Sequence, residues 1–326
     1  MAEYYEAPVA ADLQATEKKI VNTSLTALPE PYISGLKLNA DISLNGLTLN
    51  TIDENDVLWV VSDVDGWWSL PESEVPDLPR GFGDGSYDSV GRWATRLITL
   101  TGSFLPQKPS DAAAARNSLI QALTMVKTGG WLIVYEDKAD YPTGNGKAAY
   151  VRLSGAPQIT SVNARGRHDF SVLLKAADPL KYEYIDANPD GYNTATATLG
   201  SEVVVNNTGN VAVPAIFVLT GGVTADSNNY VSILNNTTVK SINLIANVSS
   251  ALSLEVDTYN REILSVTPGA AADGSDLVQN ARSTAEVLVD WIYLEPGLNT
   301  IKYLDVDGTV NASASCEVLW RSGWIG

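Results

Sequence analysis

The sequence predicts a mainly β protein with one clear helix, built from an N-terminal α+β domain and a C-terminal β-sandwich. Short runs with apolar residues at alternating positions recur along the chain, one stretch alone has strong helical spacing, and the composition shifts near residue 182. With 326 residues the chain exceeds one average domain. We therefore expect an N-terminal arm at 1–33 and two domains at 34–182 and 183–326.

The first domain opens with a predicted strand pair. Residues 1–33 lack a core face, apart from a possible short helix around Val9–Lys19, and end in the rigid Pro-Glu-Pro at 29–31. In the next stretch, GLKLNADISLNGLTLNT, Asn45-Gly46 provides the positive φ angles of a tight hairpin turn. The apolar residues that share one parity before this turn are Leu36, Leu38, Ile42 and Leu44.

A strand and the helix follow. In RLITLTGSFLP, Ile98, Leu100 and Phe104 alternate with polar residues, which predicts a half-buried strand. The helix is expected at about 110–128, with Ser110 as N-cap and Gly129 at its end. Its apolar stripe should pack on a sheet, and consists of Ala115, Leu119, Ala122, Leu123 and Val126.

Further strands complete both domains. WLIVY, AYVRLSG and HDFSVLLKA are strand-like, with a polar loop, DKADYPTGNGKA, between the first two. A linker is expected near 180–193. Beyond it, short apolar runs are separated by Asn-Asn, Pro-Gly and Asp-Gly turns, including Glu295-Pro296-Gly297, which predicts a two-sheet sandwich.

The charge limits the partners. The formal net charge is -17, and residues 182–326 hold 5 basic and 16 acidic side chains against 16 and 22 in residues 1–181. Specific nucleic-acid binding, which draws on clustered Lys and Arg, is therefore not expected. We find no signal-peptide pattern and no apolar run long enough to span a membrane, so we expect a soluble protein that is made in the cytoplasm, is not secreted and does not insert into membranes.

The sequence contains few candidates for catalytic, metal-binding or phosphate-binding residues. His168 is the single histidine and Cys316 the single cysteine, so we expect no metal site, and we interpret both as structural residues. The glycines of RGFGDGS lack the preceding strand and following helix of a phosphate loop. The two Asp-x-Asp-Gly pieces that end at Gly66 and Gly308 fit hairpin turns better than calcium loops, and we expect Glu295-Pro296-Gly297 to be a hairpin turn as well. We expect no cofactor, no catalytic residues and no enzyme, although a carboxylate pair across a cleft cannot be recognised from sequence.

The segment DGWWSLPESEVPDLPRGFGDGS, residues 65–86, has neither helical nor strand periodicity. Its prolines keep it extended and remove ladder hydrogen bonds, and its aromatic residues are typical anchors of protein interfaces. Two interpretations stay open: the segment docks on another protein chain, or it folds back over its own core. The candidate interface residues are Trp67, Trp68, Leu70, Phe82 and Tyr87.

From residue 46 to the end, the chain resembles the distal tail proteins (Dit) of long-tailed, non-contractile (siphovirus-type) bacteriophages. The resemblance lies in the order and spacing of several stretches, each mostly strand and turn. In the first half these are GLTLNT, GRWATRLITLTGSF, the Ala-rich helix, GGWLIVYED, AYVRLSG and FSVLLKAADPLKYE. In the second half they are VVNNTGNVAVPAIFVLTG, LSLEVDTYNREI, WIYLEPGLNTIKYL and LWRSGWIG.

The resemblance implies a structural virion protein of the tail tip or baseplate. It implies a homohexameric ring formed by a tail-tube-like N-terminal domain, with a galectin-like sandwich projecting outward. The ring would join the tail tube protein to the tail hub, contact other tail-tip proteins and let DNA pass.

Two other functions stay open. A galectin-like sandwich could be a carbohydrate-binding module that contacts the host cell wall, although the fold alone carries no sugar site. Its tryptophans Trp291, Trp320 and Trp324 lie in or beside strand runs, where we expect core packing. Hydrolysis of a wall polymer is the third possibility.

Overall fold

The computed structural model describes residues 40–76, 78–82, 84, 86–87, 90–136, 146–164, 166–184, 191–221, 231–245, 253–266, 277–280, 286–305 and 313–326. The chain divides into two compact units, one that extends to Leu180 and takes in Gly326, and one that spans Lys181–Ile325. The composition change predicts a boundary after residue 182. The N-terminal arm, Leu36, Leu38, the loop at 137–145, residues 185–190 of the 180–193 linker and the turn at Gly308 lie outside the described residues.

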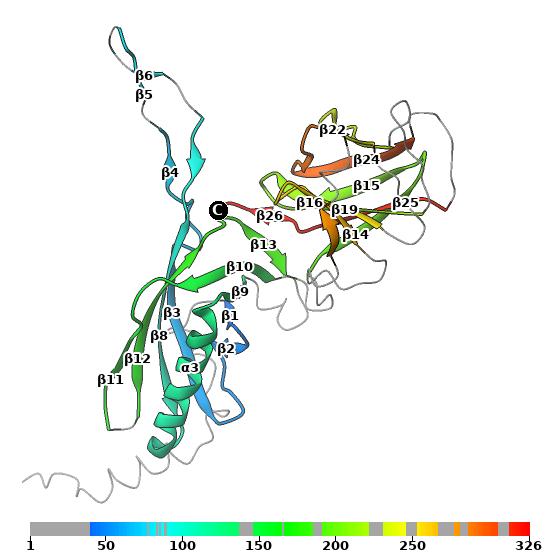
Figure 1. Ribbon diagram of the computed structural model, residues 1–326. Coiled ribbons are helices and arrows are strands. Elements are labelled where there is room, and N and C mark those ends of the chain that lie inside the picture. The colour runs from blue at the N-terminus through cyan, green and yellow to red at the C-terminus, as the bar shows by residue number, and fades with distance from the viewer. Residues whose placement is uncertain are drawn as a thin grey trace, which may run out of the picture. The chain divides into compact units, whose positions relative to one another are not determined.

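The first unit is an antiparallel sheet with one helix on it (Figure 1). Its strand order is β2-β1-β9-β10-β12-β8-β3, and β11 pairs with β12 at one edge. The strands are β1 (Asp41–Leu44), β2 (Leu47–Leu49), β3 (Val57–Asp65), β8 (Arg96–Pro106), β9 (Gly130–Tyr135), β10 (Gly146–Leu153), β11 (Gln158–Ser161) and β12 (His168–Ala176).

Local sequence patterns account for several of these strands. Asn45 and Gly46 have φ angles of 50° and 87° and join β1 to β2, as predicted. Ile42 and Leu44 are buried on β1. On β8 the predicted apolar face of Ile98, Leu100 and Phe104 is buried, and on β12 so are Phe170, Val172 and Leu174.

Strand β3 was not predicted, although it is nine residues long and pairs with β8. Val57, Trp59 and Val61 alternate toward the core, but the register with β8 shifts between Val61 and Asp63. The extra residue, Ser62, changes the parity, so that Val64 faces the core as well. Because the bulge interrupts the period of two, the apolar pattern is hidden in the sequence.

Helix α3 (Ala112–Val126) buries the predicted stripe of Ala115, Leu119, Ala122, Leu123 and Val126. Figure 1 shows the helix against one face of the sheet, and it contacts β8, β9 and β10. The prediction that Ser110 is the N-cap was wrong. Ser110 lies inside a 3-10 turn, η2 (Pro109–Asp111), because Pro109 has its φ fixed near the helical value and starts the turn earlier.

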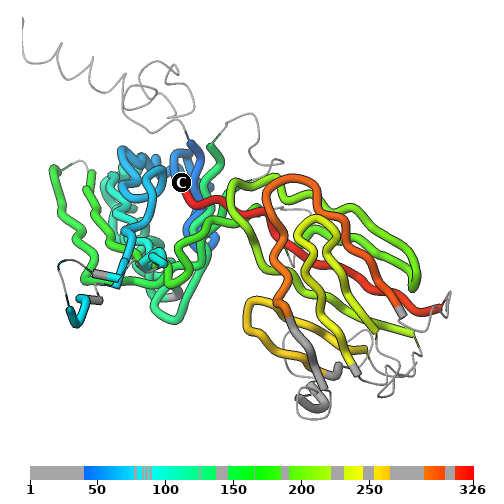
Figure 2. Tube along the Cα trace, turned by 90° about the horizontal axis from the view of Figure 1, so that it is seen from above, coloured from blue at the N-terminus to red at the C-terminus, as the bar shows by residue number. Residues whose placement is uncertain are grey.

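The second unit is a two-sheet sandwich, as predicted, and its described residues contain no helix. Figure 2 shows its strands running side by side as long hairpins. One sheet has the order β14-β25-β16-β19-β20-β21, and β23 (Tyr293–Leu294) also pairs with β16. The strands of this sheet are β14 (Asn193–Thr198), β25 (Ser315–Trp320), β16 (Val213–Thr220), β19 (Ser253–Asp257), β20 (Glu262–Val266) and β21 (Leu277–Asn280). The other has the order β15-β24-β17-β18-β22: β15 (Glu202–Asn207), β24 (Gly297–Asp305), β17 (Val231–Asn235), β18 (Lys240–Ile245) and β22 (Glu286–Val289). A short pair, β13 (Lys181–Tyr184) and β26 (Gly323–Trp324), joins the two ends of the unit.

The turn at Glu295-Pro296-Gly297 differs from its prediction. Gly297 has a φ of 90°, but the turn joins β23, which pairs with β16, to β24, which belongs to the other sheet. It is therefore a crossover between the two layers rather than a hairpin turn.

The predicted core roles in this unit hold for Cys316 and two tryptophans. Cys316 is fully buried, and burial followed by the nearby charge of Glu317 raises the pKa of its thiol. Trp320 is buried and its Nε1 donates a hydrogen bond to the Asn206 carbonyl at 3.1 Å. Trp291 is partly buried and packs against the same core, whereas Trp324 is half-buried in β26.

Helix α3 offers a matched test of its packing. Leu119 is fully buried against the sheet, whereas the adjacent Ile120 is 44% exposed. We expect Leu119→Ala to lower the free energy of unfolding of the first unit by about 2–5 kcal/mol, because it leaves a cavity in the core. Ile120→Ala should change it by less than about 1 kcal/mol. Urea denaturation of the full chain measures both, and equal effects would contradict the packing described.

Candidate assembly surface

The most exposed apolar segment of the first unit is a long hairpin extension between β3 and β8. We call residues 66–95 the β-arm. It contains two short antiparallel ladders, in which β4 (Ser73–Glu74) pairs with β7 (Arg92–Trp93) and β5 (Leu78–Pro79) pairs with β6 (Ser86–Tyr87). Figure 1 shows it extending beyond the ends of β3 and β8, away from helix α3.

The expectation that prolines keep this segment out of any ladder was wrong. Pro79 itself pairs with Ser86. A proline is tolerated in a two-residue ladder with a solvent-exposed edge, because few backbone N–H groups are required there. The aperiodic sequence therefore forms a hairpin whose pairing is too short to produce an alternating pattern.

Trp67 corrects another prediction, because this candidate interface residue belongs to the core of its own unit. Gly66 has a φ of 83°, and the backbone N–H of Trp67 donates to the Val64 carbonyl at 3.3 Å. This turn directs the Trp67 side chain inward, where it is fully buried. The first tryptophan of the segment thus covers the core of its own unit, as one interpretation predicts, and the residues after it are exposed, so that docking on another chain stays a prediction for those residues.

Arg96, the first residue of β8, holds the root of the β-arm. Its side chain is 1% exposed. Its Nη1 donates to the carbonyls of Gly66 at 2.8 Å, Ser69 at 2.8 Å and Trp67 at 3.3 Å. Its Nε donates to the Pro179 carbonyl at 2.8 Å. Burial lowers the pKa of Arg96, but a guanidinium with four carbonyl acceptors keeps its charge at neutral pH.

Gly66 is required at the same root. A Cβ added to this residue would lie 2.0 Å from the carbonyl oxygen of Leu97, a backbone atom that cannot move aside. The positive φ and this close approach both exclude other residues. The Asp-x-Asp-Gly piece is therefore a turn, as predicted, but it joins β3 to the β-arm rather than closing a tight hairpin.

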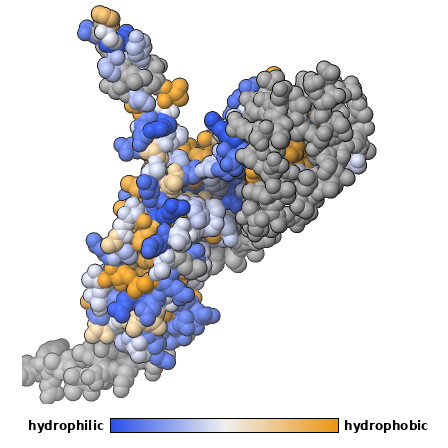
Figure 3. Space-filling view, in the orientation of Figure 1, coloured by the Kyte–Doolittle hydropathy of each residue, from blue (hydrophilic) through white to orange (hydrophobic). Residues whose placement is uncertain are grey.

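Beyond the root the β-arm exposes apolar side chains. Four of the five predicted interface residues are among them, namely Trp68, Leu70, Phe82 and Tyr87, and Phe82 is 99% exposed. The sequence analysis missed Val75, Val90 and Trp93, two of which follow the 65–86 segment. In the described residues, seven of the sixteen exposed large apolar side chains lie between residues 68 and 93. Figure 3 shows apolar residues along this extension and at its outer end.

Within the β-arm the side-chain contacts are weak. Arg92 pairs with Glu74 at 3.1 Å, but their side chains are 78% and 53% exposed, and such pairs contribute little. The guanidinium of Arg80 lies 5.9 Å from the ring centroid of Tyr87. The β-arm is thus fixed firmly at its root and only loosely along its length.

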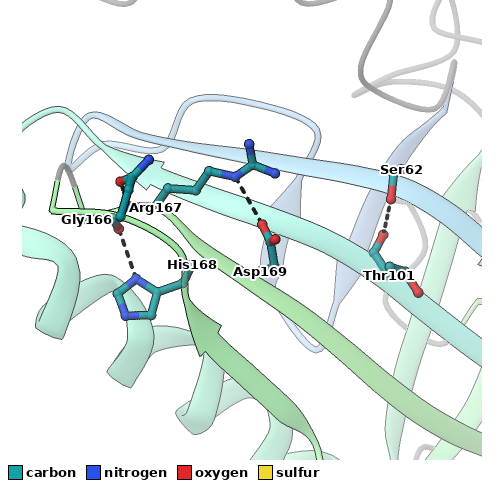
Figure 4. Close-up of polar contacts among 7 residues, drawn as sticks. Ser62, Thr101, Gly166, Arg167, His168 and Asp169 are labelled. Carbon is teal, nitrogen blue, oxygen red and sulfur yellow. Dashed lines mark hydrogen bonds and ion pairs between the residues drawn. The ribbon is translucent and has the colours of Figure 1, made fainter.

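The other candidate groups have structural roles. His168 begins β12, where its Nδ1 lies 2.9 Å from the Gly166 carbonyl oxygen (Figure 4). Its ring stacks on that of Phe104, with 4.9 Å between the ring centroids. Arg167 pairs with Asp169 at 3.0 Å on the surface. Of the glycine run, Gly83 and Gly85 lie outside the described residues, and Gly81 has open space beside it. The described residues contain no cluster of three or more possible metal ligands and no helix able to cross a membrane.

One carboxylate in the second unit is shifted. Glu255 lies half-buried on β19, on the outer face of its sheet, with Asp257 two residues further along the strand. Burial, followed by the charge of Asp257, raises the pKa of Glu255. Burial of this carboxylate and the charge of its neighbour on the same strand account for the shift.

Comparisons with known proteins give the class of fold. No family model and no curated protein matches the sequence. The fold is similar to that of Dit from phage SPP1, whose crystal structure is described as a paradigm of the hub adsorption apparatus in phages that infect Gram-positive bacteria. The two align with a TM-score of 0.53 and 18% identity over 87% of this chain and 98% of that chain. A chain of the activated phage P2 baseplate with Ca also aligns, over 86% of this chain and 97% of its own. Its TM-score of 0.41 and identity of 6% are too low to indicate a shared fold. At these identities the similarity establishes the fold, and function has to be argued from the surface.

The root of the β-arm gives a testable prediction. Arg96→Met should lower the free energy of unfolding of the first unit by about 3 kcal/mol or more, since buried carbonyls lose charged donors. It should also raise hydrogen exchange at the amides of residues 67–70. Arg116→Met, on the exposed side of α3, is the matched control and should change neither. Unchanged hydrogen exchange in the Arg96 variant would contradict the role of the Arg96 hydrogen bonds in fixing the root of the β-arm.

Glu255 gives a pH prediction. Because its pKa is higher in the folded than in the unfolded chain, the folded state binds a proton more readily, and stability is lost as pH rises through the interval between these two values. Glu255→Gln should therefore raise the melting temperature at pH 7, and the gain should vanish below about pH 4, near the unfolded pKa. Calorimetry at both pH values measures it, with the exposed Glu295→Gln as control. A gain independent of pH would contradict the cause given.

Proposed function

We propose that the protein is a structural component of a phage tail tip, in which copies assemble into a hexameric ring that joins the tail tube to the central hub. The observation that carries this proposal is the β-arm. It exposes seven large apolar side chains, and its root is fixed by a buried arginine. A segment of this kind favours contact with another protein, because clustered exposed apolar surface is costly unless a partner covers it.

The Dit-like fold supports the assembly to which the β-arm would belong. In this proposal residues 34–182 form the ring, a galectin-like sandwich at 183–326 projects outward, and the partners are the tail tube protein, the hub and other tail-tip proteins. DNA passes through the ring without specific binding, consistent with a net charge of -17. The protein acts in the virion, at the tail tip, without catalysis and without a cofactor.

The second unit gives little support to the alternative of a carbohydrate-binding module. Sugar recognition commonly uses exposed aromatic rings, but Trp320 is buried and Trp291 packs against the core of the sandwich. Among the described residues of this unit, Tyr259 is the only exposed large aromatic side chain. The exposed tryptophans named in this structure, Trp68 and Trp93, lie on the β-arm instead. Binding of cell-wall glycans by a monomeric protein would favour the alternative.

The assembly role is tested by changing the exposed side chains of the β-arm. We expect the full chain to form six-membered rings, and expect Phe82→Ser combined with Tyr87→Ala to reduce them at least about tenfold, because aromatic anchors dominate interface energies. Native mass spectrometry measures the distribution of masses. Trp67→Ala is unsuitable for this purpose, because it would damage the core instead.

Tyr259→Ala is the matched control for this test. Tyr259 is 57% exposed in the second unit and Tyr87 is 60% exposed on the β-arm, so Tyr259→Ala removes about the same exposed area as the Tyr87→Ala change of the β-arm variant. The control variant should assemble like the unchanged protein. Equal loss in both variants, or full assembly of the β-arm variant, would contradict the proposed role of the β-arm.

A further inference from the structure

A ring that closes by rotation needs two different surfaces on each copy, because the contact is head-to-tail rather than self-complementary. The β-arm supplies one of them if the proposed function is right. The second surface has to lie elsewhere on the chain and has to complement the β-arm in charge and polarity. The following inference therefore rests on the proposed function and identifies that second surface.

The face of the first-unit sheet opposite α3 carries an exposed patch at the end from which the β-arm leaves. The strand registers place Lys175 opposite Leu97 on one side and opposite Arg152 on the other. Residues two positions along each strand share the same face. We call the set the Arg152–Lys175 patch, and it comprises Leu97 and Thr99 on β8, Leu173 and Lys175 on β12, and Tyr150 and Arg152 on β10.

Two cations face each other in this patch without an acid between them. Arg152 and Lys175 are direct cross-strand partners, and like charges in this position are unfavourable. Within the described part of the chain neither side chain has a hydrogen bond or an ion pair. The acids on the same face lie elsewhere. Asp63 and Asp65 on β3 are separated from β12 by the whole of β8, and Asp169 on β12 lies six residues from Lys175 and pairs with Arg167 at 3.0 Å. In a chain of net charge -17, such a pair favours a negatively charged partner.

The patch is also apolar. Leu97 is 53% exposed, Tyr150 46% and Leu173 37%. Together with the seven residues of the β-arm, they make ten of the sixteen exposed large apolar side chains in the described residues. A partner that fits this surface is therefore both acidic and apolar.

The β-arm has this composition. Residues 68–93 contain five acids and two bases, a net charge of -5 + 2 = -3, besides their exposed apolar side chains. A chain cannot use its own β-arm for this contact, since the β-arm extends away from the sheet (Figure 1). We propose that the Arg152–Lys175 patch binds the β-arm of a second copy, so that each copy gives its β-arm to one neighbour and receives one from the other.

DNA is the other anionic candidate, and the patch suits it less well. Two cations among three exposed apolar residues would neutralise few phosphates, whereas DNA-binding surfaces carry many basic groups. An acidic protein segment matches both properties of the patch. Binding of DNA is therefore an outcome of the test rather than part of the proposal.

Charge reversal tests the contact in the full-length protein. Lys175→Glu should raise the concentration needed for half-maximal ring formation by about tenfold or more, because a favourable charge contact becomes a repulsive one. Lys127→Glu, an exposed change of the same type after α3, should leave it unchanged. Adding Glu72→Lys and Glu74→Lys to the Lys175→Glu chain should restore assembly in part. Circular dichroism and melting temperature establish that each variant is folded.

Mixing two deficient variants tests the direction of the contact. One variant carries Phe82→Ser and Val90→Ser on the β-arm with an intact patch, and the other carries Lys175→Glu with an intact β-arm. At a concentration that gives rings with the unchanged protein but lies below the half-maximal concentrations of both variants, each alone should be monomeric. Their mixture should give a one-to-one pair in native mass spectrometry, because one intact β-arm and one intact patch remain.

Several outcomes would overturn the inference. Rings that form equally well with Lys175→Glu would contradict the inference alone and leave the proposed function standing. The same holds if no pair forms on mixing, or if Lys175→Glu abolishes binding of a DNA duplex but not assembly. An unchanged protein that stays monomeric would contradict both the proposed function and this inference.

Discussion

The buried guanidinium of Arg96 is the interaction on which the exposed surface of the first unit depends. It joins the start of β8 to the carbonyls of residues 66, 67 and 69 and to Pro179. Four charge-assisted hydrogen bonds repay the cost of removing this cation from water, and they also fix the direction in which the chain leaves β3. Without this contact the direction in which the β-arm leaves the sheet would not be fixed, and ordering it on a partner would cost more conformational entropy.

The same root determines which tryptophan packs inside and which faces outward. Gly66 turns the backbone, Trp67 enters the core, and Trp68 remains exposed. Leu97 is the next residue after Arg96 on β8 and belongs to the Arg152–Lys175 patch. Thus one short stretch of chain positions both the β-arm and part of the surface that we propose for its neighbour. A single structural element would then support both contacts of the proposed head-to-tail ring.

The sequence allowed the locally determined parts of the fold to be predicted. The Asn45-Gly46 turn, the alternation on β8 and the stripe of α3 follow from spacing and turn chemistry within a few residues. Strand β3 could not be recognised in this way, because the bulge at Ser62 shifts its parity. The position of Trp67 could not be predicted either, because its backbone carbonyl is held by Arg96, 29 residues further along the chain. The Arg152–Lys175 patch depends on strand register, since β10 and β12 are separate in sequence and their pairing is set by the tertiary fold.

The central claim is that the β-arm is a preformed surface which another copy covers. Electron cryomicroscopy of the isolated full-length protein tests it most directly, because a reconstruction would show both the number of copies and the position of each β-arm. Our account predicts closed six-membered rings in which every β-arm lies against the sheet of its neighbour. Single molecules, or rings whose β-arms extend into solvent without contacting a neighbouring copy, would contradict it.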